Sequence, residues 1–165
     1  MPRMRRALTI DDLAALARLS SGPHEPKELY AAMDRLVQEV IGHKLFTLMR
    51  VHEATAEVER IYSSNEAAYP VGGRKGKRGT PWSRAVLDRG EVFIARDPGE
   101  VRAAFSDHEL IASLGIGSIM NVPIGCRGRR LGTMNISHEA GWFGEEDAAA
   151  GRLVAAFLVP SLLAE

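Results

Sequence analysis

Apolar residues recur at helical spacing in two runs near the start of the chain, with a polar break between them. The first run follows Thr9 and Asp12, which resemble a capping box with Asp in place of the usual Glu, and it ends at residues 20–23 (Ser-Ser-Gly-Pro). The second run follows Pro26 and places apolar side chains every three or four residues until Gly42. The pattern predicts two helices joined by a short turn.

The spacing then changes to the alternation that is typical of strands. Residues 45–53 and 57–63 are rich in aromatic and β-branched side chains and are separated by three residues, which predicts a hairpin. A third strand is expected at residues 92–95. Residues 118–124 and 131–138 predict a second hairpin. Two hairpins favour a mostly antiparallel sheet with helices packed against it.

The segments between the strands are polar or helical. Residues 65–79 are rich in Gly, Lys and Arg, so we expect a polar loop that contributes nothing to the core. Thr80 and Pro81 favour the start of a short helix, because a hydroxyl N-cap followed by Pro is a common helix start. Helical spacing returns at residues 101–114, with a break in the middle, and at residues 145–158.

Composition limits the classes of function. The chain has 165 residues, 21 basic and 21 acidic side chains and one Cys. Balanced charge argues against a dedicated nucleic-acid or anionic-membrane binder, and no apolar run is long enough to cross a bilayer. One Cys cannot form an internal disulfide and fits a reducing compartment, so we expect a cytoplasmic protein. We expect a tail and helix at residues 1–25, with disorder at 1–7, and one domain at 26–165.

The Gly-rich basic run at residues 72–79 invites comparison with a phosphate-binding loop. Its spacing does not match a Walker loop, because Lys77 and Arg78 stand where the motif requires Gly and Lys. The run still lies just ahead of the expected helix start at Thr80, where free N–H groups attract anions. A solvated loop and an anion contact therefore both stay open, and the anion contact would use Arg74, Lys75, Lys77 and Arg78.

The candidate catalytic groups lack the spacing that catalysis or metal binding requires. Cys126 lies in the expected loop at residues 125–130, among cations that would favour its reactivity if it were exposed, but there is no second Cys. His108 or His138 could act as a single axial haem ligand, although nothing in the sequence requires it. We assign no catalytic residue, metal site or cofactor. No HExxH motif or i, i+4 pair occurs among the five His residues, His24, His43, His52, His108 and His138.

Alternation divides the predicted sheet into two unlike faces. One face is apolar on the best-defined strands, so the long helices should cover it. The other face mixes apolar groups with hydrogen-bonding ones, a composition that is typical of a small-molecule cavity. Exposure of this second face to solvent stays open as the alternative. The residues expected on the second face are Thr47, Met49, Ile119, Asn121, Pro123, Thr133, Asn135 and Ser137.

Three segments carry a family resemblance. They are residues 114–124 (Leu-Gly-Ile-Gly-Ser-Ile-Met-Asn-Val-Pro-Ile), residues 128–136 (Gly-Arg-Arg-Leu-Gly-Thr-Met-Asn-Ile) and residues 142–147 (Trp-Phe-Gly-Glu-Glu-Asp), which open the last expected helix. Together with the helix and strand at the start, they are similar to the GAF domain, a small-molecule sensing module related in fold to PAS. The resemblance spans roughly residues 26–163.

The resemblance implies an α+β fold with an antiparallel sheet of five to six strands. The N- and C-terminal helices would cover one face, often in a dimer, and loops and short helices would lie over a pocket on the other. The chain lacks the Asn-Lys-Phe-Asp-Glu motif of cyclic-nucleotide relatives, the Cys position of bilin-binding relatives and the second Cys of methionine sulfoxide reductases. These three activities are therefore disfavoured.

We expect a non-catalytic sensory or regulatory module that binds a small organic ligand of unknown identity, forms a homodimer through its terminal helices, and passes its signal to a separate partner. Two alternatives are a redox or hydrolytic enzyme that uses Cys126 or a His, and a protein-interaction domain without a ligand. The expected ligand-binding residues are Thr47, Met49, Trp82, Phe105, Ile111, Asn121, Thr133 and Asn135.

Overall fold

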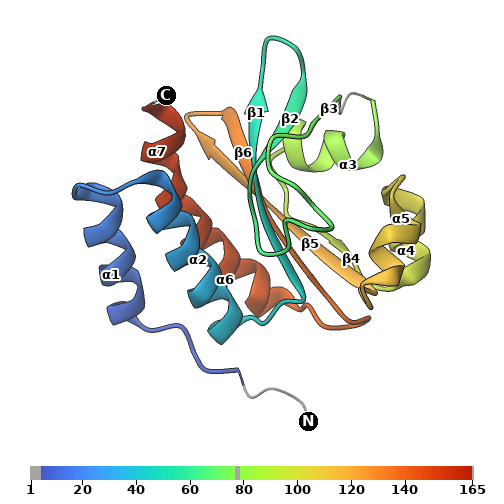
Figure 1. Ribbon diagram of the computed structural model, residues 1–165, viewed down its shortest axis with the longest axis horizontal. Helices are drawn as coiled ribbons and strands as arrows, with labels where there is room; N and C mark the ends of the chain where they lie inside the picture. Colours follow the sequence, from blue (N-terminus) through green and yellow to red (C-terminus); the bar gives the residue numbers. More distant parts are fainter. Residues whose placement is uncertain (1–4, 77–78, 165) are drawn as a thin grey trace.

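The computed structural model describes residues 5–76 and 79–164, and these residues form a six-stranded antiparallel sheet with helical segments on both sides (Figure 1). The strand order is β3-β2-β1-β6-β5-β4, and every neighbouring pair is antiparallel. This architecture confirms the predicted α+β fold. The strands are β1 (Leu45–His52), β2 (Glu57–Ser63), β3 (Arg74–Gly76), β4 (Phe93–Ala95), β5 (Ser118–Cys126) and β6 (Arg129–His138).

The helices begin and end close to the predicted signals. Thr9 and Asp12 form the expected capping box, and Thr80 caps α3. The final helix, expected as one segment, is interrupted by a 3₁₀ turn at Ala156–Leu158, and Pro160 lies in the first turn of the last helix. The helices are α1 (Ile10–Ser21), α2 (Pro26–Val40), α3 (Pro81–Ser83) with a π turn at Arg84–Asp88, α4 (Pro98–Ala104), α5 (His108–Ser113), α6 (Glu145–Ala155) and α7 (Val159–Leu163).

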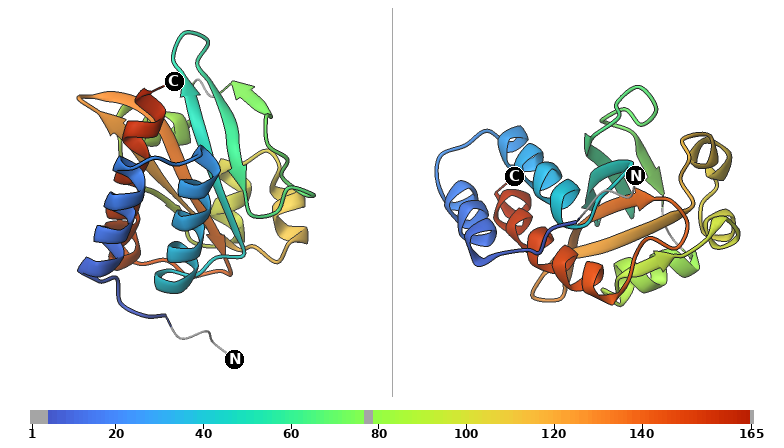
Figure 2. Two further views of the ribbon diagram at one scale, coloured as in Figure 1. Left: turned by 60° about the vertical axis from the view of Figure 1, so that its left-hand side comes forward. Right: turned by 90° about the horizontal axis from the view of Figure 1, so that it is seen from below.

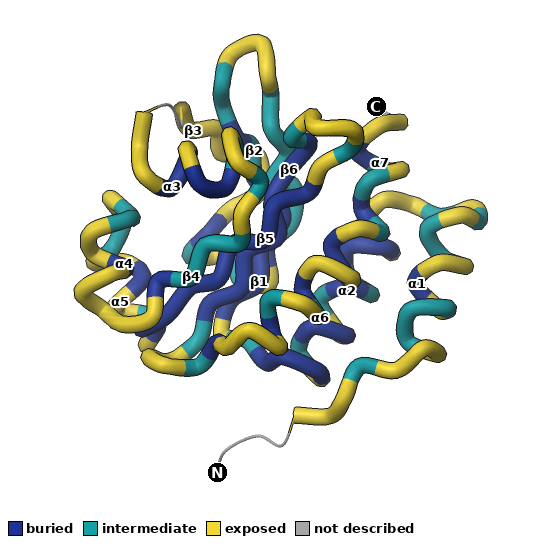
Figure 3. Tube along the Cα trace, turned by 180° about the vertical axis from the view of Figure 1, so that it is seen from behind, coloured by how far each residue is buried: buried dark blue, intermediate teal, exposed yellow. Residues whose placement is uncertain are grey.

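The terminal helices cover one face of the sheet (Figure 2). α2 and α6 pack on the strands, and α1 packs against α2, α6 and α7 from outside. Buried residues are concentrated along the strands and on the sides of α2 and α6 that face them (Figure 3). The strand residues in this core are apolar, as the alternation predicted: Phe46, Leu48, Met120, Val122, Ile124, Met134 and Ile136. We call this side of the sheet the helix face.

The opposite side of the sheet, which we call the cavity face, is covered by short segments. Residues 64–73, α3 with its π turn, α4 and α5 lie over it (Figures 1 and 2). Their contacts with the strands form a second, smaller core, which contains Leu45, Tyr69, Val101, Ile111 and Ile119.

The structure corrects two expectations about polar segments. Residues 5–7 are not disordered, because Arg5 pairs with Asp147 at 2.9 Å and Arg6 pairs with Asp12 at 2.7 Å. Residues 1–4 of that prediction lie outside the described residues. The stretch expected to be a polar loop contains the edge strand β3 and buries Tyr69, so it does contribute to the core.

The second hairpin is tighter than predicted. Its turn consists of Arg127 and Gly128, which have φ values of 52° and 83°, as the two central residues of a type I′ turn do. Cys126 therefore belongs to β5 and pairs with Arg129, instead of lying in a loop. Pro123 lies beyond the last residue of β5 that pairs with β4, so its missing N–H faces an open edge, one of the positions expected for it.

Within residues 5–76 and 79–164, no helix combines the length and the apolar composition that a membrane crossing requires.

Candidate ligand-binding site

A partly open cavity of about 70 Å³ lies between the cavity face and its cover. Sheet residues form its floor, and residues of the cover close it from above. The volume is well below the roughly 300–1,000 Å³ of most ligand pockets, so the cavity has room for a few heavy atoms only. Its lining residues are Leu45, Thr47, Met49, Arg60, Tyr69, Lys75, Trp82, Phe105, Asp107, Ile111, Ile119, Asn121, Asn135 and Ser137. We call it the sheet-face cavity.

A row of hydrogen-bonded side chains crosses the floor of this cavity. Trp82 Nε1 donates to Asn121 Oδ1 at 2.9 Å, Asn121 Nδ2 donates to Asn135 Oδ1 at 2.7 Å, and Asn135 Nδ2 donates to Thr47 Oγ1 at 3.2 Å. The strand register places these groups side by side, because Asn121 pairs with Asn135 and Asn135 pairs with Thr47. All four residues are buried. The row is a fixed polar surface with apolar residues around it.

The cover is held by an aromatic and ionic cluster at one end of the cavity. The Tyr69 hydroxyl donates to Asp107 Oδ2 at 2.6 Å. Burial, together with this bond, holds the pKa of Tyr69 well above its usual value, so the hydroxyl stays protonated. The Arg60 guanidinium lies over the Tyr69 ring, with Cζ 4.8 Å from the ring centroid. Phe105 contacts Phe93 edge-on.

Arg60 is the buried charge of the site. Its Nη1 donates to the carbonyl of Pro70 at 3.1 Å. Its Nε is buried and has no hydrogen-bond partner among the described residues. Burial lowers the pKa of this guanidinium, while the negative charge of Asp107 acts in the opposite direction. An arginine remains protonated under these conditions, so the cavity contains an incompletely satisfied cation.

The structure brings together most of the residues that the sequence assigned to a ligand site. Thr133 lies on the same face but does not line the cavity, and its buried Oγ1 has no partner among the described residues. Arg60 was missed, although its alternation with Val58 in β2 places both on one buried face and could have indicated it. The predicted residues that line the cavity are Thr47, Met49, Trp82, Phe105, Ile111, Asn121 and Asn135.

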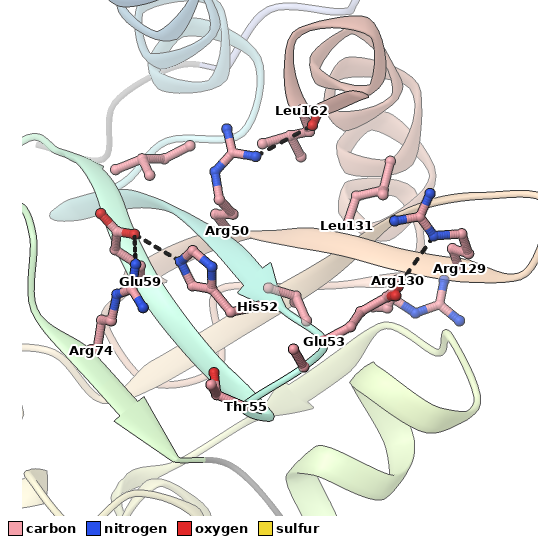
Figure 4. Close-up of a pocket in the computed structure, with 13 residues that line it drawn as sticks. Arg50, His52, Glu53, Thr55, Glu59, Arg74, Arg129, Arg130, Leu131 and Leu162 are labelled. Carbon is pink, nitrogen blue, oxygen red and sulfur yellow. Dashed lines mark hydrogen bonds and ion pairs between the residues drawn. The ribbon is translucent and has the colours of Figure 1, made fainter. Parts of the chain in front are cut away.

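A second, larger concavity of about 600 Å³ lies on the helix-face side of β1 and β2, beside the two hairpins (Figure 4). Most of its charged groups pair with one another. Glu59 accepts from His52 Nε2 at 2.8 Å and pairs with Arg74 at 3.3 Å, and Arg129 pairs with Glu53 at 3.4 Å. The bond from His52, followed by the charge of Arg74, lowers the pKa of Glu59. We call this concavity the hairpin groove.

The four cations expected to contact an anion do not form one cluster. Arg74 lines the hairpin groove, whereas Lys75 lines the sheet-face cavity. Lys77 and Arg78 lie outside the described residues.

Cys126 and the histidines are not arranged as a catalytic pair. The hollow beside Cys126 contains no His, Asp or Glu among its described lining residues. Nε2 of His43 lies 2.6 Å from Asp34 Oδ1, and Nδ1 of His24 contacts the carbonyl of Gly22. Across residues 5–76 and 79–164, no three His, Cys, Asp or Glu side chains are close enough to hold a metal ion.

Comparisons with known proteins agree on one fold. Residues 25–160 match the family model of the GAF domain. A search of curated proteins finds no match. Many solved structures are similar. One is the GAF domain of a phosphoenolpyruvate-protein phosphotransferase from Coxiella burnetii, with a TM-score of 0.74, 17% identity, and coverage of 94% of this chain and 92% of that one.

Two further structures extend the comparison. The phycoerythrobilin-bound GAF domain of a cyanobacterial phytochrome has a TM-score of 0.70 and 17% identity, covering 97% of this chain and 99% of that one. The GAF domain of a sensor histidine kinase from Bacillus halodurans has a TM-score of 0.69 and 15% identity, covering 86% of this chain and 99% of that one. At these identities the likeness establishes the fold.

Proposed function

The chain belongs to the GAF domain family, as the sequence resemblance predicted, and on this premise we propose that it is a non-catalytic sensory module that binds a small organic ligand in the sheet-face cavity. The observation that carries the proposal is the row from Trp82 through Asn121 and Asn135 to Thr47. Such a fixed polar surface, bordered by apolar residues, orients a ligand while the apolar walls provide contact area.

The size of the cavity restricts the ligand. With about 70 Å³ available, the ligand has a few heavy atoms. It lies against the asparagine row, with its apolar part toward Phe105 and Ile111. A larger ligand requires the cover to move away, which would break the bond between Tyr69 and Asp107.

The signal would leave through the segments that contact both the ligand and the rest of the molecule. Binding fixes the cover and changes the balance of conformations in the sheet, against which the terminal helices pack. We propose that these helices form a homodimer and pass the change to a separate signalling protein. Their exposed apolar side chains, Ile10, Leu153 and Leu163, support this surface as the interface.

The test is a screen of small organic compounds against the ¹⁵N-labelled protein by NMR. The side-chain amides of Asn121 and Asn135 and the indole N–H of Trp82 give resonances that report on the cavity floor directly. We expect at least one compound to shift them. Ile111→Trp should abolish those shifts, because the larger ring fills the cavity.

The matched control is Leu110→Trp, which introduces the same ring one residue away at a position that is 40% exposed. It should bind like the wild type. The proposal is overturned if no compound shifts the three reporters, or if the shifts persist in a folded Ile111→Trp variant. Native mass spectrometry of the same samples measures whether the protein is a dimer.

A further inference from the structure

The most informative group in the sheet-face cavity is the Arg60 guanidinium. Its side chain is 8% exposed and lines the cavity, and Nε has no partner among the described residues. A buried donor without an acceptor costs more free energy than an exposed one, and the cost is larger for a charged group. A structural role in holding the cover accounts for the bond from Nη1 to Pro70. It does not account for Nε.

The charge of the lining residues also favours an anionic ligand. Of the described residues that line the cavity, Arg60 and Lys75 are cations and Asp107 is the one anion. Asp107 already accepts the hydroxyl proton of Tyr69 at 2.6 Å. The described lining therefore carries one excess positive charge, which a ligand with a single negative charge would balance.

The remaining walls decide what kind of anion fits. Phe105, Ile111 and Ile119 offer apolar contact that a fully hydrated inorganic ion cannot use. A guanidinium presents its donors in a planar fork that matches a carboxylate. The asparagine row offers further donors and acceptors in the same cavity.

We propose that the ligand of the sheet-face cavity is a small organic monocarboxylate whose carboxylate binds the Arg60 guanidinium and whose short apolar part lies against Phe105 and Ile111. This inference rests on the proposed function and specifies the ligand class for the same cavity. No covalent step is involved. The acid binds as its anion, and Arg60 Nε is a guanidinium donor that the described residues leave buried without an acceptor.

The test compares acids with their uncharged amides of nearly identical shape. Propionate and propionamide, and butyrate and butyramide, are titrated into the ¹⁵N-labelled protein at pH 7, with the Asn121, Asn135 and Trp82 resonances as readout. We expect the acids to bind roughly tenfold or more tightly than the amides. A hydrogen bond between charged groups is stronger than one between neutral groups, and the difference corresponds to about tenfold in affinity.

Two variants locate the charge that the acid recognises. Arg60→Gln should remove the preference for acids over amides. Arg74→Gln removes an exposed cation on the neighbouring strand, outside the cavity, and should retain it. If Arg60→Gln does not fold, the comparison of acid with amide in the wild type still decides the inference.

Each other outcome has a defined meaning. Equal binding of acids and amides overturns the proposal of a carboxylate ligand but leaves the proposed function standing. Retention of the preference for acids in a folded Arg60→Gln variant has the same consequence. Inorganic phosphate or chloride that competes fully with propionate indicates a simple anion site and also overturns the inference. The failure of every compound, including neutral ones, to shift the three reporters overturns the proposed function itself.

Discussion

The two faces of the sheet are built from alternate residues of the same strands, yet different interactions dominate on each face. On the helix face, Phe46, Leu48 and Met134 belong to an apolar core that includes residues of α2 and α6. On the cavity face, the neighbouring residues Thr47 and Asn135 are equally buried but bind one another through side chains. A one-residue step along a strand therefore changes the dominant interaction from apolar packing to hydrogen bonding.

The location of unsatisfied polar atoms makes the contrast sharper. Arg60 Nε and Thr133 Oγ1 are both buried on the cavity face without a partner among the described residues. Helix-face strand residues in the core are apolar, and the third such atom among the described residues, His43 Nδ1, belongs to the turn that precedes β1. Unsatisfied buried groups reduce stability and are concentrated where proteins bind ligands. The helix face thus provides stability, whereas the cavity face retains binding capacity at a cost in stability.

Gly132→Ala is the change with the largest expected effect, and it acts on the helix face. A Cβ at this position would collide with the backbone carbonyl of Met49 and lie 3.1 Å from Leu162 Cδ1. Because backbone must move, β1 and β6 would separate, and we expect a loss of about 3 kcal/mol or more in the free energy of unfolding. Urea denaturation measures it.

The matched control for this prediction is Gly76→Ala in β3. A Cβ there meets nothing within 4 Å, so the stability should change by less than about 0.5 kcal/mol. Similar losses of stability in the two variants would mean that the close approach of β6 to β1 does not determine the stability of the helix face.

The division into two faces could be predicted because it depends on local alternation. The strand period of two assigned Thr47, Asn121 and Asn135 to one side without knowledge of the strand order. The row they form then follows from the antiparallel register, which hydrophobic patterning fixes when one face is buried. Most of the residues of the cavity floor could therefore be predicted from the sequence.

The cover could not be predicted in the same way. Tyr69 lies in a polar stretch and is buried because segments distant in the sequence meet it in space, among them Asp107, 38 residues later, and Arg60. Such contacts arise from the tertiary fold and leave no periodic signal in the sequence.

The second prediction tests the polar coupling of the cavity face. Asn121→Leu removes the bond from the Trp82 indole N–H and the bond to Asn135 Oδ1, so we expect a loss of about 2 kcal/mol in the free energy of unfolding. Asn135→Leu should cost a similar amount. The double variant should cost less than the sum, by about 1 kcal/mol, because the bond between the two asparagines is counted twice.

The contrast with the helix face supplies the control. Met134→Leu, at the residue next to Asn135, conserves volume and leaves no polar group unpaired, so its cost should stay below about 1.5 kcal/mol. Additive losses from Asn121→Leu and Asn135→Leu in urea denaturation would show that the row is not a coupled unit.

The smallest expected effect concerns His138, at the end of β6 where the chain turns toward α6. Its ring stacks on Trp142, with centroids 3.6 Å apart, and Trp142 Nε1 donates to the carbonyl of Ile41 in the helix layer. The Nδ1 atom of His138 accepts from the Glu139 backbone N–H at 2.7 Å, which requires the neutral ring with its proton on Nε2. Arg5 also lies over the Trp142 ring, 4.2 Å from its centroid, so a protonated His138 would be a second cation beside it.

These contacts set the sign of a pH dependence. Burial lowers the pKa of His138 in the folded protein; the charge of Glu139 opposes this effect, and the charges of Lys44 and Arg5 add to it. Below the ordinary histidine pKa of about 6.5, the unfolded chain therefore binds more protons than the folded one, and stability falls as the pH decreases. Because the ring is only partly buried, screening limits the effect to about 0.5 kcal/mol between pH 7.5 and pH 5.5. Urea denaturation at both values, for the wild type and His138→Phe, isolates it, since carboxylate titrations common to both proteins cancel in the difference. We expect the wild type to lose more stability on acidification than the variant. An equal or smaller loss would mean that His138 becomes protonated in place, and that the contact between the end of the sheet and the helix layer tolerates a second cation.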